Sequence, residues 1–239
     1  MTRHIREREN RIHFFLMWAR LLGFLGLSGC ALPPAPMERV ELANKARQEE
    51  LAVLFIGNSY SFGVPAEFKR LAISRGKRVR IGHSTYGGWS LAQHSKHEPT
   101  LRKLREHRWD VVVLQDFSLH PAMKRNRRAR AMNPAIQFFV SEIRRMGAVP
   151  LLYQTWGRRD GNLAIHGDTF LAMNRRVREG YQAASRKAGG VIMVPVGDAW
   201  EREVRAGRGH RLFQEDGSHP SAEGNKLTAE VFCQIIFGE

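Results

Sequence analysis

Two short segments contain the residues whose types and spacing best suit chemistry. Ser59 lies in the segment 55–61 (FIGNSYS), where a glycine permits a tight turn after an apolar run. Asp216 and His219 lie in the segment 216–220 (DGSHP). A serine hydroxyl becomes a nucleophile when a base takes its proton, and that base needs a carboxylate to orient it. The pattern therefore predicts a triad of Ser59, His219 and Asp216.

Each segment also has a simpler explanation when it is taken alone. A Gly-Asn-Ser sequence makes a good turn and a good helix cap. The second segment is equally suited to a helix-capping turn with a histidine on the surface. The triad requires that the fold bring both segments together, so the elements around them have to be considered.

Five short apolar runs predict the strands that position these groups: 51–57, 78–84, 110–115, 148–154 and 191–196. Continuous β-branched runs of this kind suit strands that are buried on both faces. Helical patterns with one apolar face lie between them, at 68–72, 136–146, 170–184 and 227–235. This alternation predicts an α/β fold with about five parallel strands covered on both faces, a three-layer α/β/α sandwich. Reactive side chains should lie beyond the carboxyl ends of those strands.

Together the two segments resemble the SGNH hydrolase superfamily, also called GDSL-type esterases and lipases. That family has a Gly-Asp-Ser block after its first strand and an Asp-x-x-His block before its last helix; this chain has a Gly-Asn-Ser variant at 57–59 and the second block at 216–219. The resemblance covers residues 51–237. It implies a flavodoxin-like fold and hydrolysis of an ester or related acyl bond by Ser59, Asp216 and His219, without a cofactor or a metal.

The resemblance also implies an oxyanion hole. Its donors would be the backbone N–H groups of Ser59 and of a glycine after the second strand, for which we choose Gly88 ahead of Gly87. The family's third block, Gly-x-Asn, is replaced here by the segment 114–118 (LQDFS). Gln115 carries the same kind of amide donor on a longer side chain, so we expect it to stand in for the asparagine.

Two further residues are candidates for substrate binding. Trp156 follows the fourth strand and could stack on a sugar ring, although a structural loop explains the segment equally well. Asn58 lies next to the expected nucleophile. The histidines lack the spacing of a metal site, and we expect them on the surface or in loops: His83, His94, His97, His120 and His166.

The N-terminus predicts export. A basic start leads into the apolar run 21–27, which is too short to span a bilayer. The following Leu-Ser-Gly-Cys, ending at Cys30, resembles the lipobox of bacterial lipoproteins, in which the cysteine is lipidated. We expect residues 1–30 to be a lipoprotein signal peptide, 31–49 a tether and 50–239 the hydrolase domain. The protein would then be anchored by Cys30 in the cell envelope, on the periplasm-facing side of the outer membrane.

Two alternatives remain for this terminus. One is an uncleaved signal anchor in which Cys30 has no special role. The other is a translation start at Met17, which would leave a shorter basic region before the apolar run. In either case Cys233, in an apolar helical pattern, is expected to be a buried side chain.

The net charge of +15 favours anionic partners. The densest cationic run is 124–130 (KRNRRAR), which follows the third strand. It could attract an anionic glycan or lipid, or it could simply form a solvated face. The chain has no zinc finger, helix-turn-helix or aromatic RNA-binding motif, so we do not expect a nucleic-acid partner.

The residues thus favour an envelope serine esterase that acts on acylated glycans or small esters. The altered third block supports a different hypothesis, a non-catalytic protein of the same fold that binds an anionic glycan. A lipase or thioesterase would need an apolar acyl channel beside Ser59. Fold alone selects no substrate, and the oligomeric state stays open.

Overall fold

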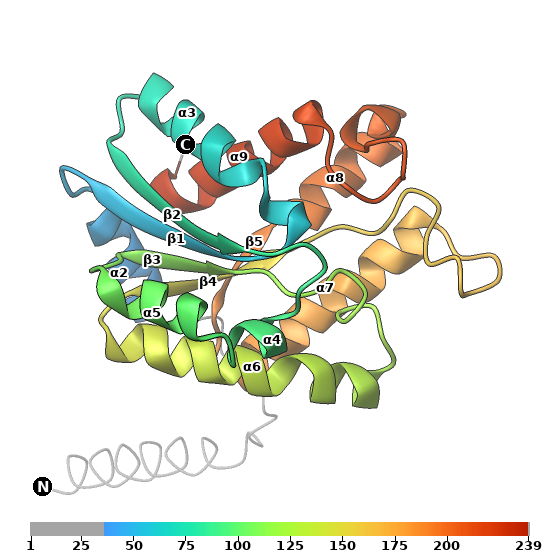
Figure 1. The fold of residues 1–239 in the computed structure, drawn as a ribbon. Helices are drawn as coiled ribbons and strands as arrows, with labels where there is room; N and C mark the ends of the chain where they lie inside the picture. Colours follow the sequence, from blue (N-terminus) through green and yellow to red (C-terminus); the bar gives the residue numbers. More distant parts are fainter. Residues whose placement is uncertain (1–35, 239) are drawn as a thin grey trace, which may run out of the picture. The chain divides into compact units, whose positions relative to one another are not determined.

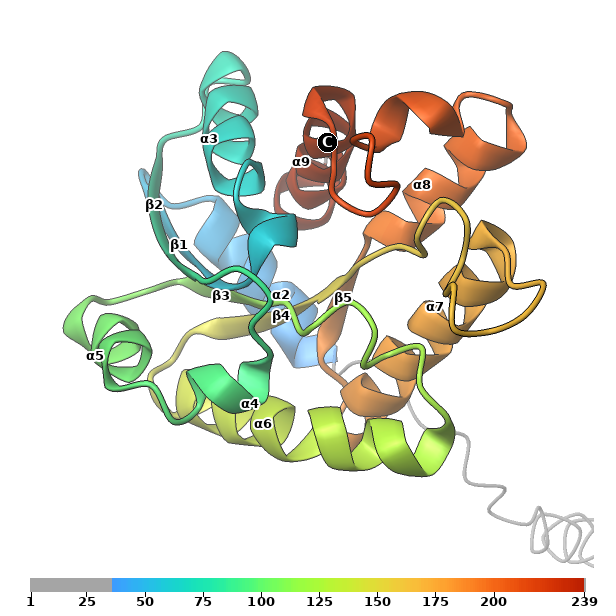
Figure 2. The same ribbon diagram turned by 45° about the vertical axis from the view of Figure 1, so that its right-hand side comes forward.

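The computed structural model describes residues 36–238, which build a five-stranded parallel sheet between two layers of helices (Figures 1 and 2). The strands run in the order β2-β1-β3-β4-β5, the order of flavodoxin. They are β1 (Leu51–Gly57), β2 (Val79–Thr85), β3 (Val111–Leu114), β4 (Val149–Gln154) and β5 (Ile192–Pro195). Each lies within one residue of the run that predicted it, so the α/β/α prediction is confirmed.

The helices divide between the two faces of the sheet. One core includes side chains of α2 (Pro36–Ala46), α3 (Val64–Ser74), α8 (Val196–Arg205) and α9 (Ala222–Phe237). The other includes side chains of α4 (Leu91–His94), α5 (Glu98–Glu106), α6 (Arg125–Arg145) and α7 (Phe170–Lys187). The helical patterns of the sequence fall in α3, α6, α7 and α9. In the described residues, α2, α4, α5 and α8 are additions to the prediction.

The side chains of β1 show why its sequence is apolar throughout. Val53 and Phe55 pack into the core of α3 and α9, whereas Leu54 and Ile56 pack into the core of α6 and α7. Successive side chains of a strand point to opposite faces, so a central strand covered on both faces needs apolar residues at every position. The strand is buried along its full length.

Helix α2 corrects the expected boundary of the domain. The segment 31–49 was predicted to be a tether, but Pro36–Ala46 forms a helix that packs on the domain. Leu42 is 4% exposed in the core, and Glu38 accepts a 2.7 Å hydrogen bond from Arg144. Four of its eleven residues are charged, and Met37 and Val40 are exposed, so no continuous apolar face marked this helix in the sequence.

Residues 33–239 form one compact unit, and both hydrophobic cores lie inside it. A unit with its own core can fold by itself. Cys233 is buried, as expected. The predicted signal peptide and Cys30 lie outside the described residues. None of the helices in the part that the structure describes is long and apolar enough to cross a membrane.

Candidate active site

Ser59 lies at the point where the strand order of the sheet reverses. Strand β1 pairs with β2 on one side and with β3 on the other, which is the point at which ligands bind in open parallel sheets. The short 3₁₀-helix Ser59–Ser61 follows β1, and the Asn58 side chain caps it by accepting the Tyr60 N–H at 3.2 Å. Ser59 itself is partly exposed. The turn therefore presents its hydroxyl at the carboxyl edge of the sheet.

The fold brings Ser59, His219 and Asp216 together. His219 Nε2 lies 2.9 Å from Ser59 Oγ, a contact between residues 160 positions apart in the chain. Its Nδ1 is hydrogen-bonded to Asp216. An ionised carboxylate can only accept, so Nδ1 carries the proton and Nε2 accepts from the serine. This is the protonation that a general base for Ser59 requires.

Asp216 is held as an anion. Burial raises the pKa of this carboxyl, but hydrogen bonds from His219 and from two backbone N–H groups lower it by more than burial raises it. The net effect is a pKa of about 2. Those N–H groups belong to Ser218 and His219, at 2.9 and 3.0 Å. A negative carboxylate in this position is suited to stabilise an imidazolium at His219.

The loop that carries Asp216 and His219 is fixed by its own backbone. Phe213 and Pro220 form an isolated β-bridge, and the Gln214 N–H donates to the His219 carbonyl at 2.9 Å. Gly217 has a φ of +64°, a left-handed conformation that glycine adopts without strain. These contacts give the loop one shape before any substrate is bound.

Trp156 is placed differently from the prediction. It is fully buried, stacked on Tyr60 at 4.8 Å and on Trp200 at 3.7 Å between ring centroids. Its indole N–H donates to the Ser218 carbonyl at 3.1 Å. Because both ring faces are covered, the prediction that Trp156 stacks on a sugar is wrong. It supports the loop that carries His219.

Gln115 is also placed differently. The side chain is fully buried, and its oxygen accepts the Asn58 N–H at 2.8 Å and the Ser61 hydroxyl at 3.1 Å. Its amide nitrogen donates to the Asp116 carbonyl. Gln115 therefore supports the turn 57–61 that carries Ser59, which we call the nucleophile turn. Since its amide hydrogen bonds are made inside the protein, the prediction that it donates to an oxyanion is wrong.

Asn58 has a structural role as well. It is 2% exposed, and its amide donates to the Trp89 carbonyl at 2.8 Å. With both ends of the amide engaged in the protein, the prediction that Asn58 binds substrate does not fit the structure. The contact instead joins the nucleophile turn to the glycine loop after β2.

The glycine loop 85–89 is tied to the nucleophile turn at two points. The Tyr86 N–H donates to the Gly57 carbonyl at 3.1 Å, and the Trp89 carbonyl accepts from Asn58. Gly88 lies between these ties, exposed and with a φ of +74°. Its N–H donates to no group within residues 36–238. An exposed, unengaged amide beside the nucleophile turn is what an oxyanion donor needs.

Sequence reasoning missed His94, which was expected on the surface or in a loop. It is fully buried, and burial lowers its pKa to about 4, so the ring is neutral at pH 7. Nε2 donates to the Gly57 carbonyl at 2.8 Å, and Nδ1 accepts from the Thr100 hydroxyl at 3.1 Å. His94 thus holds the carbonyl at which the nucleophile turn begins. The capping box formed by Ser90 and Gln93 was a local signal for the short helix that carries His94, but not for the burial of its side chain.

Comparison with known proteins locates the fold. No family model and no curated protein sequence matches this chain. Among solved structures, a DUF4886 family protein from Bacteroides uniformis is similar, with a TM-score of 0.68 and 21% identity. The alignment covers 80% of this chain and 84% of that one.

Two further structures are named for hydrolase families. A GDSL-like lipase from Parabacteroides merdae has a TM-score of 0.57 at 13% identity, covering 79% of this chain and 96% of that one. A catalytic mutant of Axe2, an acetylxylan esterase from Geobacillus stearothermophilus, has a TM-score of 0.62 at 13% identity, covering 78% and 94%. At such identities the likeness concerns the fold: this chain has the α/β/α architecture found in GDSL-like lipases and esterases.

Proposed function

We propose that this protein is a serine ester hydrolase in which Ser59 is the nucleophile, His219 the general base and Asp216 the carboxylate that orients His219. The observation that carries the proposal is the continuous hydrogen-bonded series from Ser59 Oγ through His219 to Asp216. It lies at the carboxyl edge of the sheet, where the fold presents reactive groups. The hydrolase names among proteins of the same fold agree with this chemistry.

The proposed reaction has two half-reactions. His219 Nε2 takes the Ser59 proton while Ser59 Oγ bonds to the acyl carbon, and the backbone N–H groups of Ser59 and Gly88 stabilise the oxyanion. His219 then gives the proton to the departing alcohol, which leaves an acyl-serine. Water attacks that ester with His219 again as base, and the carboxylic acid is released as Ser59 regains its proton.

The proposed substrates are esters with small acyl groups, such as acetylated glycans. The side chains of His219 and Asp216 are 36% and 46% exposed, so these groups lie near the surface and not at the end of a buried apolar channel. Axe2, which shares the fold, is an acetylxylan esterase. The segment ending at Cys30 supports a further part of the proposal, export and lipid anchoring in the cell envelope.

A second candidate function is a non-catalytic protein that binds an anionic glycan. The observation that favours it is the burial of Gln115, which leaves the oxyanion site without the side-chain donor of the family's third block. Loss of one oxyanion donor costs about 10²–10³ in rate. Reactivity of Ser59 separates the two functions.

The experiment is labelling of purified residues 33–239 with a fluorophosphonate probe, which reacts with activated serines. We expect labelling of the unmodified domain and of Ser141→Ala, a matched control on the exposed side of α6. We expect none with Ser59→Ala or His219→Ala. Hydrolysis of p-nitrophenyl acetate should follow the same order. A folded domain that neither labels nor hydrolyses would reject the triad and favour the binding protein.

A further inference from the structure

The loop between β4 and α7 holds two large aliphatic side chains in solvent. Leu163 is 84% exposed and Ile165 is 44% exposed. The loop is nevertheless well tied: the Asn162 N–H donates to Asp168 at 2.7 Å, and Asp168 also accepts from Arg176 at 3.0 Å. An ordered loop that keeps apolar side chains in water gains no folding stability from them. Such surfaces commonly mark interaction sites.

The first two turns of α6 carry an unusual cationic cluster, which we call the α6 cluster: Lys124, Arg125, Arg127, Arg128 and Arg130. None of these five forms an ion pair with another residue of the described part of the chain. By contrast, many arginines elsewhere are paired with carboxylates, as in Arg70 with Glu67 and Arg208 with Glu203. Cations at a helix N-terminus are also unfavourable to the helix dipole. The α6 cluster therefore gains no ion pair from the described part of the chain and opposes the dipole of the helix that carries it.

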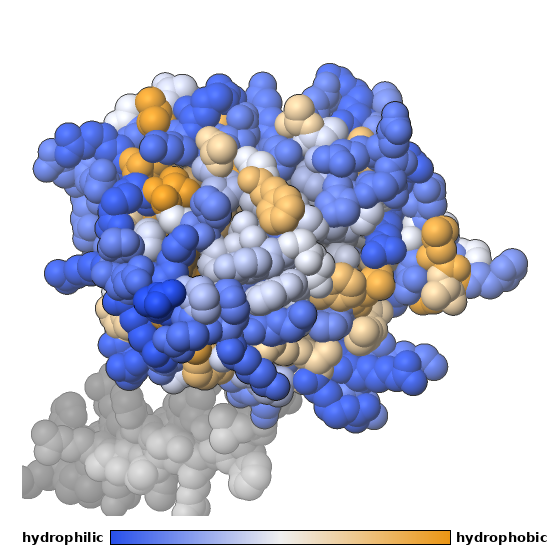
Figure 3. All heavy atoms as spheres, in the orientation of Figure 1, coloured by the Kyte–Doolittle hydropathy of each residue, from blue (hydrophilic) through white to orange (hydrophobic). Residues whose placement is uncertain are grey.

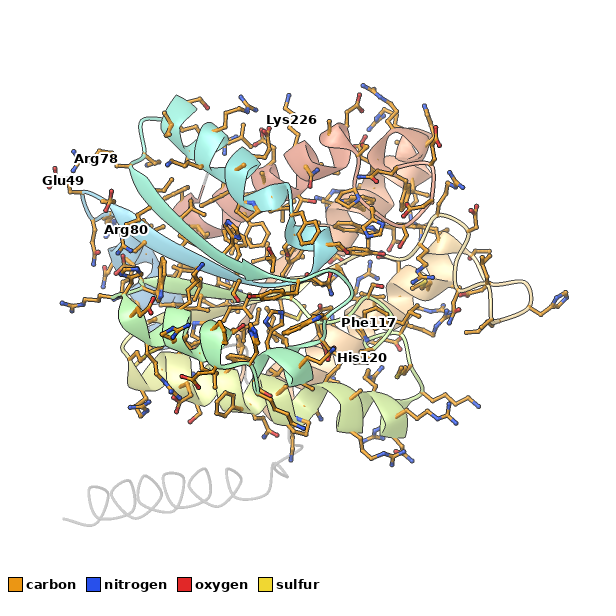
Figure 4. The ribbon with its side chains drawn as sticks, in the orientation of Figure 1. Glu49, Arg78, Arg80, Phe117, His120 and Lys226 are labelled. Carbon is orange, nitrogen blue, oxygen red and sulfur yellow. The ribbon has the colours of Figure 1, made fainter. Side chains whose placement is uncertain are left out.

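Both features lie on the side of the molecule that carries Ser59. The strands end on that side, and the start of α6 and the β4–α7 loop project from it in both ribbon views (Figures 1 and 2). Hydrophobic side chains protrude at the edge of the surface where this loop lies (Figure 3). Phe117 and His120, labelled in Figure 4, belong to the loop from β3 to α6, which runs along the chain from the carboxyl end of β3 to the α6 cluster.

We propose that this face docks on a bilayer that contains anionic phospholipids, with Leu163 and Ile165 entering the interface and the α6 cluster binding lipid phosphates. Aliphatic side chains need a hydrocarbon environment, which a soluble polyanion does not supply. The unpaired cations need anions, which a zwitterionic bilayer supplies poorly. An anionic lipid surface satisfies both features together, and docking does not depend on whether Ser59 is reactive.

The test is co-sedimentation of residues 33–239 with vesicles. One set contains phosphatidylcholine with phosphatidylglycerol, and the other phosphatidylcholine alone. One variant is Leu163→Ser/Ile165→Ser, and the other is Arg125→Gln/Arg127→Gln/Arg130→Gln. Ile73→Ser, at a 57% exposed position on α3, is the matched apolar control. The matched charge control replaces three exposed, ion-paired arginines by glutamine: Arg70, Arg78 and Arg208.

We expect salt-sensitive binding to the anionic vesicles and much weaker binding to phosphatidylcholine. Each cation near an anionic surface contributes about a fivefold change, so the triple variant should lose about a hundredfold in partition coefficient. The aliphatic variant should lose about tenfold or more. Both controls should bind within about twofold of the unmodified domain.

Three outcomes would overturn the proposal. The first is no binding to the anionic vesicles, and the second is equal binding to both vesicle types. The third is loss in the charge variant while the aliphatic variant binds like the unmodified domain, because that result shows general attraction of a basic protein to polyanions. The first two outcomes need no variant, so folding of the variants does not limit the test.

Discussion

The two halves of the candidate site are built in opposite ways. The nucleophile turn is held by buried side chains from other segments: His94 binds the Gly57 carbonyl, and Gln115 binds the Asn58 N–H. The loop 213–220, which carries Asp216 and His219 and which we call the base loop, holds these two side chains half-exposed. Asp216 makes its hydrogen bonds to groups within three residues of itself. One half depends on buried side chains from distant segments, whereas the hydrogen bonds of Asp216 in the other half come from a short stretch of chain, to which the buried Trp156 adds a contact at Ser218.

This difference separates two kinds of mutational effect. Changes beneath the nucleophile turn leave buried polar groups without partners, so they should lower the stability of the whole domain. Changes in the base loop should lower activity while the fold persists, because few buried contacts depend on the loop's titrating groups. The following predictions test whether this separation holds, beginning with the largest expected effect.

Asp216→Asn should lower kcat/KM for p-nitrophenyl acetate by about 10³–10⁴, since an amide neither fixes the His219 tautomer nor stabilises its cation. The melting temperature should change little. Asp160→Asn is the matched control, because Asp160 is exposed and pairs with Arg159 near the same loop. A loss below about tenfold, with the fold intact, would remove Asp216 from the triad.

His94 predicts a stability effect with a defined pH window. Its pKa is about 4 in the folded chain and about 6.5 in the unfolded chain. Between these values the unfolded chain binds a proton that the folded chain does not, so the free energy of unfolding falls by about 3 kcal/mol as the pH drops from 6.5 to 4. This contribution is complete above pH 6.5. His94→Gln keeps a donor for Gly57 and should flatten the profile.

The measurement is urea unfolding across that pH window. His210→Gln provides the comparison, because it removes one histidine from an exposed position. If His94→Gln retained the full pH dependence of the unmodified domain, the buried neutral histidine would not be its source. The contact of His94 with the Gly57 carbonyl would then contribute less to the stability of the nucleophile turn than we infer from its burial.

The sequence was informative where a property is local or repeats along the chain. Apolar runs located every strand within one residue, since a strand buried on both faces has to be apolar throughout. The spacing of Asp216 and His219 places both groups on one turn, and the structure brings them to Ser59. The five strands of the described residues therefore followed from residue type and order, whereas the grouping of the three side chains also depended on the family resemblance.

The sequence was uninformative where a role depends on what lies above or beneath a side chain. Trp156 lies just after the carboxyl end of β4, a position from which an indole could stack on a sugar. Tyr60 and Trp200, which come from distant segments, nevertheless cover both of its faces. Gln115 and His94 have ordinary polar side chains whose partners are backbone groups some forty to sixty positions away. No periodicity in one chain encodes such tertiary contacts.

Gln115→Ala should lower the free energy of unfolding by about 1–3 kcal/mol, because it leaves the Asn58 N–H and the Ser61 hydroxyl buried without an acceptor. Gln137→Ala is the control, as Gln137 is exposed on α6. Chemical denaturation measures the effect. If the loss of activity far exceeded the loss of folded protein, Gln115 would act on the reaction more directly than its burial indicates.

Tyr60→Phe addresses a second hydrogen bond between the two halves, beside the one that joins His219 to Ser59. The Tyr60 hydroxyl lies 2.6 Å from the Ser218 hydroxyl, while the ring stacks on Trp156. Phenylalanine keeps the stack and removes the hydrogen bond, so we expect a cost of about 0.5–1.5 kcal/mol in stability and a small fall in kcat.

A double-mutant cycle with Ser218→Ala measures how much of that effect belongs to the contact. If the halves communicate through it, the two changes together should cost little more than either alone. Strictly additive losses would mean that each hydroxyl acts within its own half. In that case the buried indole of Trp156, through its bond to the Ser218 carbonyl, would be the contact that keeps His219 in register with Ser59.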